Sequence, residues 1–170
     1  MRADGLTFTT NAGDGSNTGL EVSPRLHLGP WRLEATLTLS DPELTKLHPG
    51  FPAVPEGGLP GAAHISGGAS LSWRGPLIDG VDLLAALDYS HAGRTHLTFT
   101  KGISQGPVDL LNGRLVFDIA DSLSVGLSVG NMLDTAANQF AYGNPFTLSG
   151  GPQTTPPRPR TVRLSFGWSG

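Results

Sequence analysis

The stretch SLSVGLSVGN (residues 122–131) decides the fold, because apolar and small residues alternate through it without a break. Leu123, Val125, Leu127 and Val129 fall on one side of an extended chain, and serines and glycines fall on the other. A period of two residues is typical of a β-strand with one apolar face. The same letters contain GLSVG, which matches the G-x-S-x-G pattern of hydrolases. That pattern exposes its serine on a sharp turn between a strand and a helix. Since the alternation continues through Ser128 and no helical pattern follows, we expect a strand residue there and no catalytic residue.

The same alternation recurs along the rest of the chain. The clearest example is WRLEATLTLS (residues 31–40), and similar patterns occupy residues 19–28, 64–73, 81–91, 110–119 and 161–170. Each segment is about ten residues long, which suits a tilted strand crossing a bilayer better than the usual strand of about five or six residues. The sequence therefore predicts an all-β protein with about seven or eight long antiparallel strands.

The connections between these segments differ in length at the two ends of the strands. Short turns are expected at Gly29-Pro30, around residues 74–80 and at Ala120-Asp121. Long loops rich in glycine and proline are expected at about 41–62, 92–107 and 132–159. Short turns at one end and long loops at the other are typical of outer-membrane barrels. We therefore predict an up-and-down transmembrane β-barrel segment with short periplasmic turns and long extracellular loops.

The three tryptophans provide an independent indication. Trp31 begins a strand after a short turn, Trp73 ends a strand before one, and Trp168 lies near the end of the last strand. Following the chain up and down places all three on the apolar face at the short-turn end. This is the expected position of an aromatic girdle at a membrane interface. A soluble β-sandwich that buries the apolar face remains an alternative, because the period alone does not separate the two folds.

Composition limits the classes of function. The 170 residues contain 24 glycines and 14 prolines but no cysteine, so disulfides and thiolate metal sites are excluded. The net charge is −3 without a basic run, so no nucleic-acid partner is expected. The five histidines have no metal-ligand spacing, and no motif suggests a cofactor. No apolar run is long enough for a transmembrane helix. The N-terminal residues also lack the apolar core of a signal peptide.

The two ends of the chain resemble TonB-dependent outer-membrane receptors. In SLSVGLSVGNMLDTAANQFAYGNPFTL and RPRTVRLSFGW, a strand runs into an Asn-Leu-x-Asp-type segment, then a long loop, then an arginine-rich lead into a closing strand. These elements are Asn131-Met132-Leu133-Asp134, the loop at 139–157 and Arg158-Pro159-Arg160. Near the start, TTNAGDGSNTGLEV resembles the family's Asn-Ala-Gly and Gly-x-Glu strand, here Asn11, Ala12, Gly13, Gly19 and Glu21. The resemblance covers nearly the whole chain.

The resemblance implies a place in a much larger protein. Such receptors have barrels of about 22 strands with a plug. The resemblance therefore implies that residues 1–170 are a C-terminal portion of the barrel, without the plug and the N-terminal barrel strands. It implies a bacterial outer membrane, with membrane lipid, the remaining barrel and the plug as partners. The TonB complex would be reached only through the missing plug. The barrel-assembly machinery would contact the last strand, although Trp168 is followed here by Ser169-Gly170 instead of ending the chain.

The resemblance also implies a function, which is TonB-dependent uptake of a ferric siderophore or another scarce nutrient, and no enzymatic activity. The alternative is a complete eight-stranded outer-membrane barrel with a structural or pore role. Candidate ligand-binding residues lie in the expected extracellular loops: His91, Arg94, His96, Phe140, Tyr142 and Phe146. Ordinary loop polarity and aromatic packing on the rim are the competing interpretations of these residues.

Polar residues elsewhere have simpler expected roles. Asn131 and Asp134 follow a strand, where such side chains usually bond to the local backbone. The polar face of the strands carries charged residues that are expected to form ion pairs along the wall or to contact a plug: Arg32, Glu34, Asp82, Asp88, Arg114 and Asp118.

Overall fold

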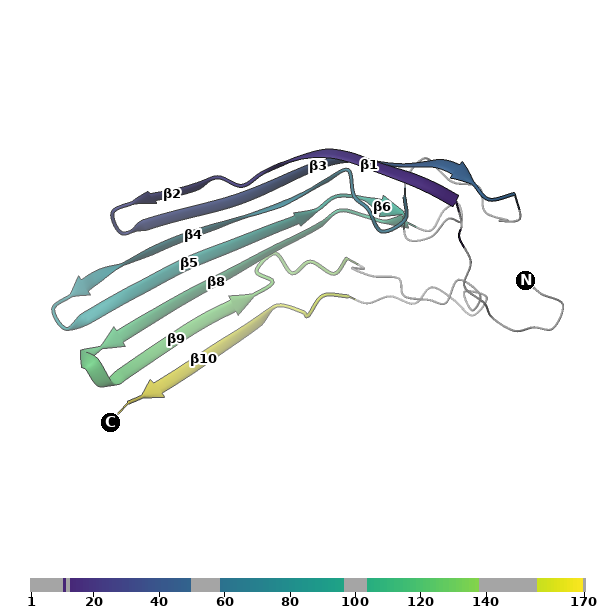
Figure 1. The fold of residues 1–170 in the computed structure, drawn as a ribbon. Coiled ribbons are helices and arrows are strands. Elements are labelled where there is room, and N and C mark those ends of the chain that lie inside the picture. Colours follow the sequence, from purple (N-terminus) through teal and green to yellow (C-terminus); the bar gives the residue numbers. More distant parts are fainter. Residues whose placement is uncertain (1–10, 12, 50–58, 97–103, 138–155, 170) are drawn as a thin grey trace.

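The computed structural model describes residues 11, 13–49, 59–96, 104–137 and 156–169, and most of them belong to one antiparallel sheet (Figure 1). Its strands are β1 (Gly13–Val22), β2 (Arg25–Leu28), β3 (Trp31–Leu47), β4 (Ile65–Ile78), β5 (Val81–Ala92), β8 (Val108–Ile119), β9 (Leu123–Gly130) and β10 (Thr161–Trp168). A second sheet pairs β6 (Thr95–His96) with β7 (Ser104–Gln105). A 3-10 turn, η1 (Ala120–Ser122), connects β8 to β9. No helix in the described part of the chain is long and apolar enough to cross a membrane.

The main sheet follows the chain up and down. Its order is β1-β3-β4-β5-β8-β9-β10, with β2 also pairing with β3, and all of these pairs are antiparallel. In Figure 1 the sheet is curved and open, with β1 and β10 at opposite edges. The expected all-β, up-and-down architecture is therefore confirmed.

The short turns use the expected glycines. Gly29 and Gly80 adopt φ angles of +56° and +73°, in the left-handed region that glycine enters without steric cost. Both turns lie at the same end of the sheet as η1 (Figure 1). We call this the turn end and the opposite one the loop end.

The register places the alternating residues on two consistent faces. Leu127 lies opposite Leu115 on one side and Leu164 on the other, while Ser128 lies opposite Arg114 and Arg163. One face of the sheet is therefore apolar across its whole width, and the other carries small and charged residues.

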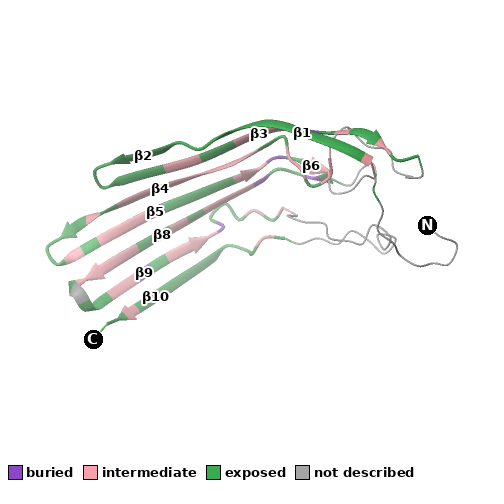
Figure 2. Cartoon of the chain, in the orientation of Figure 1, coloured by how far each residue is buried: buried purple, intermediate pink, exposed green. Residues whose placement is uncertain are grey.

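The apolar face is open rather than buried. Leu164 is 59% exposed and Trp168 is 84% exposed, and Figure 2 shows green along β10 and most of β2. Within the described residues, Ala86 and Val108 are the buried hydrophobic side chains apart from Pro42. Burying a large aliphatic side chain contributes about 1.5–3 kcal/mol, so a face of this extent needs an apolar environment.

Several strand boundaries differ from the sequence prediction. β4 continues to Ile78, through most of the turn predicted at residues 74–80, so that only Asp79 and Gly80 remain between β4 and β5. The segment 41–47, predicted as loop, continues β3 and pairs with β1, which itself begins at Gly13 and not at residue 19. Beyond Leu39 this ribbon carries mostly polar residues, so it lacks the alternation on which the prediction relied. The predicted strand 19–28 is interrupted after Val22, because Pro24 has no N–H to donate to the ladder. The Pro24 carbonyl still accepts a hydrogen bond from Ala35 N at 3.0 Å.

The connection before β4 folds against the loop end of the sheet. Leu59 N donates to the Pro42 carbonyl at 3.3 Å, and Ser40 Oγ donates to the Ala63 carbonyl at 2.6 Å. Pro42 is fully buried beneath this segment. Gly61 N donates to the carbonyl of His96 in β6 at 2.8 Å. Parts of two predicted loops, 41–62 and 92–107, therefore pack together.

Candidate functional site

The tryptophans lie where the sequence places them. Trp31 is directly opposite Trp73 on neighbouring strands, and Trp168 is opposite Leu123 at the turn end of β10. All three follow the alternation of the apolar face. The structure thus brings them to one end and one face of the sheet, although their contact with a membrane interface stays a prediction.

At the other end, the apolar face finishes in a polar cluster. The apolar band reaches Leu87 on β5 and Leu111 on β8. The next residues on that face are Tyr89 and His91, with Asp109 opposite His91. Asp109 Oδ1 accepts a hydrogen bond from the Tyr89 hydroxyl and lies 2.8 Å from His91 Nδ1.

These bonds change the acidity of Asp109, which lies outside the apolar band. The hydrogen bond from Tyr89, followed by that from His91, lowers the pKa of Asp109 below its usual value. The contact is thus strongest with an ionised carboxylate. A carboxylate with a lowered folded-state pKa adds stability above its unfolded pKa and loses that stability as the pH falls through the folded value.

We expect Asp109→Asn to lower the thermal midpoint of the refolded chain at pH 7. Below about pH 4 the difference in midpoint between the variant and the unmodified chain should become smaller, because Asp109 itself becomes protonated there. The asparagine keeps an acceptor oxygen but not the charge that strengthens both bonds. Thermal melts of the detergent-refolded chain between pH 3 and 8 measure this. Asp79→Asn, at the opposite end of the sheet, is the matched control. A difference that stayed constant with pH would contradict the role assigned to the charge.

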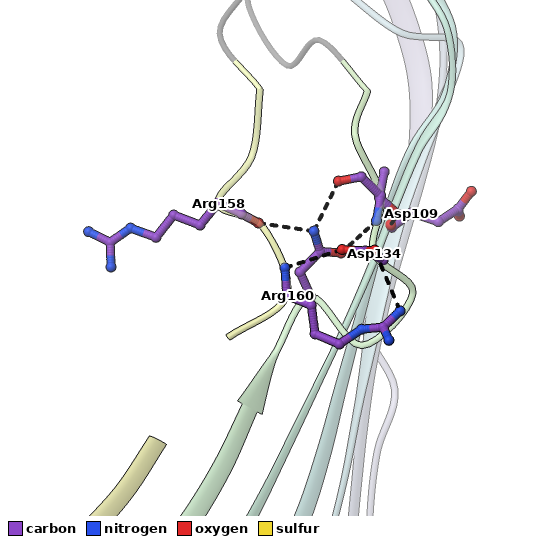
Figure 3. A network of polar contacts seen from close by, with 6 residues as sticks. Asp109, Asp134, Arg158 and Arg160 are labelled. Carbon is purple, nitrogen blue, oxygen red and sulfur yellow. Dashed lines mark hydrogen bonds and ion pairs between the residues drawn. The ribbon is translucent and has the colours of Figure 1, made fainter. Parts of the chain in front are cut away.

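Asn131 is the centre of a second network, at the ends of β9 and β10 (Figure 3). It follows β9 and is buried, with φ at +50°. Its Nδ2 donates to the carbonyls of Thr135 at 2.9 Å and Arg158 at 3.0 Å, and its Oδ1 accepts from Thr135 N at 2.9 Å. Its backbone N donates to Asn112 Oδ1 on β8 at 3.0 Å. The Nδ2 group of Asn131 thus donates two hydrogen bonds and its Oδ1 accepts one, all within the protein.

Neighbouring residues extend this network across the rim. Asp134 Oδ1 accepts from Arg160 N at 3.3 Å, and its Oδ2 is 3.9 Å from the Arg160 guanidinium (Figure 3). The Thr135 hydroxyl donates to the Asp109 carbonyl. We call the network of Asn131, Asp134, Thr135, Asp109 and the segment 158–160 the rim latch. Asn131 bonds to the local backbone at Thr135, as expected of a turn residue. Its contact with Arg158 and the contacts of Asp134 with Arg160 instead join segments that are distant along the chain, which the sequence prediction did not include.

The predicted ligand-binding residues are only partly described. His91 lies on the apolar side and bonds to Asp109, Arg94 is exposed after β5, and His96 lies in β6. Phe140, Tyr142 and Phe146 lie outside the described residues. No group of three histidine or carboxylate side chains able to hold a metal occurs within the described ranges. Ligand contact by any of these six stays a prediction.

On the polar face, Arg32, Glu34 and Asp118 form ion pairs as predicted, whereas Asp82 and Asp88 form none among the described residues. Glu34 accepts from Arg32 at 2.6 Å and lies 3.9 Å from Arg25, and Arg74 is 3.5 Å from Asp118. Within the described part of the chain, Arg114 and its row neighbour Arg163 have no ion-pair partner.

Ser128 lies in the middle of β9, between these two arginines in the register. A strand residue in a continuous ladder lacks the strained strand-to-helix turn that a hydrolase serine needs. The G-x-S-x-G match therefore follows from small residues on the polar face.

Comparison with known proteins gives a consistent picture. The sequence matches no protein-family model and no curated protein. It is structurally similar to the ferric yersiniabactin uptake receptor of Yersinia pestis (TM-score 0.77, 16% identity, 93% of this chain and 24% of that one). It is also similar to the ferric preacinetobactin receptor of Acinetobacter baumannii (TM-score 0.69, 18% identity, 94% of this chain and 23% of that one). A siderophore receptor of the same organism is similar as well (TM-score 0.71, 14% identity, 92% of this chain and 22% of that one).

These likenesses concern the fold, since the identities are low. The chain spans about a quarter of the length of the receptors that it matches. The described strands therefore have the fold of one section of a siderophore-receptor barrel.

Proposed function

We propose that this chain is part of the C-terminal barrel wall of a TonB-dependent outer-membrane receptor that takes up a ferric siderophore or a similar scarce nutrient. One observation carries the proposal: a sheet with a continuous exposed apolar face has the fold of three siderophore receptors over more than nine-tenths of its length. The apolar face would contact membrane lipid, and the polar face would line the lumen.

The open sheet favours a section of a large barrel over the alternative of a complete eight-stranded barrel. The described residues supply seven strand positions across the sheet, counting β1 and β2 as one. An eight-stranded barrel must also fill its lumen with side chains. The polar face here is largely serine and glycine, including Ser128, Gly126 and Gly167, which would leave that space poorly filled.

The partners follow from this proposal. The rest of the barrel would continue the sheet, and a plug would occupy the lumen and couple the receptor to TonB. The barrel-assembly machinery would contact β10, whose Trp168 faces the apolar side. Ligand would be bound at the loop end, where Arg94 and His96 lie. Phe140, Tyr142 and Phe146 belong to the sequence between β9 and β10 and lie outside the described residues.

We expect deletion of the gene encoding this chain to abolish growth of the source bacterium on one ferric siderophore. The reason is that such a receptor is the entry route for its own ligand. Growth curves on a panel of single ferric siderophores under iron limitation measure this, with growth on excess inorganic iron as the control. Unchanged growth on the whole panel, with the chain confirmed in the outer membrane, would contradict siderophore uptake and leave another nutrient to test.

A further inference from the structure

Two arginines on the polar face flank Ser128 in a single row across the sheet. Ser128 on β9 is directly opposite Arg114 on β8 and Arg163 on β10. Neighbouring strands lie about 4.7–4.9 Å apart, so the backbones of the two arginines are about 10 Å apart. Both arginines are exposed, and neither has an ion-pair partner in the part of the chain that the structure describes.

The surroundings of Arg114 are described on every side and do not neutralise it. Its direct neighbours on β5 and β9 are uncharged. Asp88 lies one row nearer the loop end on β5 and forms no ion pair with Arg114. Asp118, nearer the turn end, instead lies 3.5 Å from Arg74. Because a guanidinium group stays charged at any physiological pH, the row holds two permanent cations that repel each other.

The surface between the arginines is low and rich in hydroxyl groups. Gly126 and Gly130 flank Ser128 on the same face of β9, so no side chain larger than serine lies there. A Cβ at Gly126 would lie 2.5 Å from Ser165 Oγ, and one at Gly130 would lie 2.9 Å from Thr161 Oγ1. Hydroxyl groups of β10 therefore occupy the space above these glycines.

This combination of groups suits a carboxylate. A guanidinium group presents its N–H groups in a planar fork that matches the two oxygens of a carboxylate. Arginine side chains from β8 and β10 are long enough to converge above β9, where the Ser128 hydroxyl is a further donor. One carboxylate between the guanidinium groups also offsets their repulsion.

We propose that Arg114, Ser128 and Arg163 form a carboxylate-binding site on the polar face. The site deepens the proposed function, on which it rests for the lumen that this face lines. The carboxylate belongs either to a side chain of the segment inside the lumen or to a solute that passes through it. Ser128 then acts as a hydrogen-bond donor and not as a nucleophile.

Chemical modification of the arginines tests the site. Phenylglyoxal reacts with accessible guanidinium groups, and mass spectrometry of peptides gives the rate at each arginine. The chain refolded in detergent is treated with and without tricarballylate, a small tricarboxylate, at constant ionic strength. We expect saturating probe to slow the reaction of Arg114 and Arg163 by about tenfold. Arg25, exposed on the same face, should react at an unchanged rate.

A lysine variant shows whether the two arginines act together. Arg163→Lys keeps the charge but lacks the planar fork. We expect it to raise the probe concentration that half-protects Arg114 by about tenfold, and Arg25→Lys, the matched control, to leave that concentration unchanged. Ser128→Ala should raise it by about threefold. Absence of saturable protection in the unmodified chain, equal protection of Arg25, or unchanged protection of Arg114 in R163K would overturn the proposal.

The same reaction on the complete product of the gene identifies the source of the carboxylate. If the protein's own carboxylate fills the site, Arg114 and Arg163 react slowly without probe while Arg25 reacts rapidly. If a solute fills it, both react rapidly until the probe is added. Rapid reaction that the probe does not slow would overturn the site. These rates involve no uptake, so failure of the growth test on ferric siderophores defeats the proposed function and leaves this result standing.

Discussion

Arginine at position 37 should prevent stable insertion of the chain into a bilayer, whereas arginine at the adjacent position 36 should be tolerated. Leu37 lies on the apolar face, opposite Val22 and Gly67. Thr36 points to the polar face, opposite Gly68. The two variants carry the same new charge on the same strand, so only the face differs.

The expected loss of free energy of unfolding depends on how deep in the membrane the new arginine lies. An arginine on the lipid face of a barrel costs about 2–4 kcal/mol near the middle of the membrane. The Thr36 side faces water or protein, and Glu34 is two residues away on the same face. Urea titration of the chain folded into lipid vesicles, read by tryptophan fluorescence, gives the two free energies of unfolding.

The same experiment needs one control without lipid. The unmodified chain should aggregate in water, because an open apolar face and two free strand edges are exposed. A stable monomer in water, or equal tolerance of L37R and T36R in vesicles, would favour the soluble sandwich instead.

Asn131→Asp should open the rim latch while leaving the strands in place. The carboxylate keeps the shape of the amide and tolerates a positive φ, but it has no N–H to donate. The carbonyls of Thr135 and Arg158 then lose their partner. Two unsatisfied, partly buried carbonyls cost about 2–4 kcal/mol together. Hydrogen exchange of the Thr135 and Arg160 amides, relative to amides in β9, measures the local opening.

Asn112→Asp is the matched control for this variant. Asn112 contributes only an acceptor, its Oδ1, to the backbone N–H of Asn131, and aspartate retains that acceptor. We therefore expect little change in exchange at Thr135 for N112D and a large increase for N131D. Equal effects of the two variants would show that the amide donors of Asn131 do not hold the rim.

The sequence predicted the paired strands well because their signal is local. In residues 31–40 and 122–131 every second side chain is apolar, and the observed register keeps Leu37 and Leu127 on the same face. The outer ends of β1 and β3 were missed for the same reason. These ends pair through backbone hydrogen bonds between mostly polar residues, such as Asp14 with Lys46. Such residues show no alternation of apolar and polar side chains from which a strand could be predicted.

The rim contacts depend on residues that are distant along the chain. Asn131 and Asp134 were identifiable as turn residues, but their bonds to the segment 158–160 arise only when β10 pairs with β9. Likewise Asp109 meets His91 only through the register of β5 and β8. The ion pair of Arg32 with Glu34, two residues apart on one face, was predictable, whereas the lack of a partner for Arg114 was not.

The rim latch also makes the connection between β9 and β10 a modular part of the molecule. Asn131 and Asp134 fasten the chain leaving β9 to the chain entering β10, on the strand side of residues 138–155. These contacts fix the pairing register of β9 and β10 on the strand side of the connection, whatever the length of the connection. Foreign peptides could be grafted between residues 137 and 156, and natural selection could diversify that stretch, without disturbing the wall that carries it.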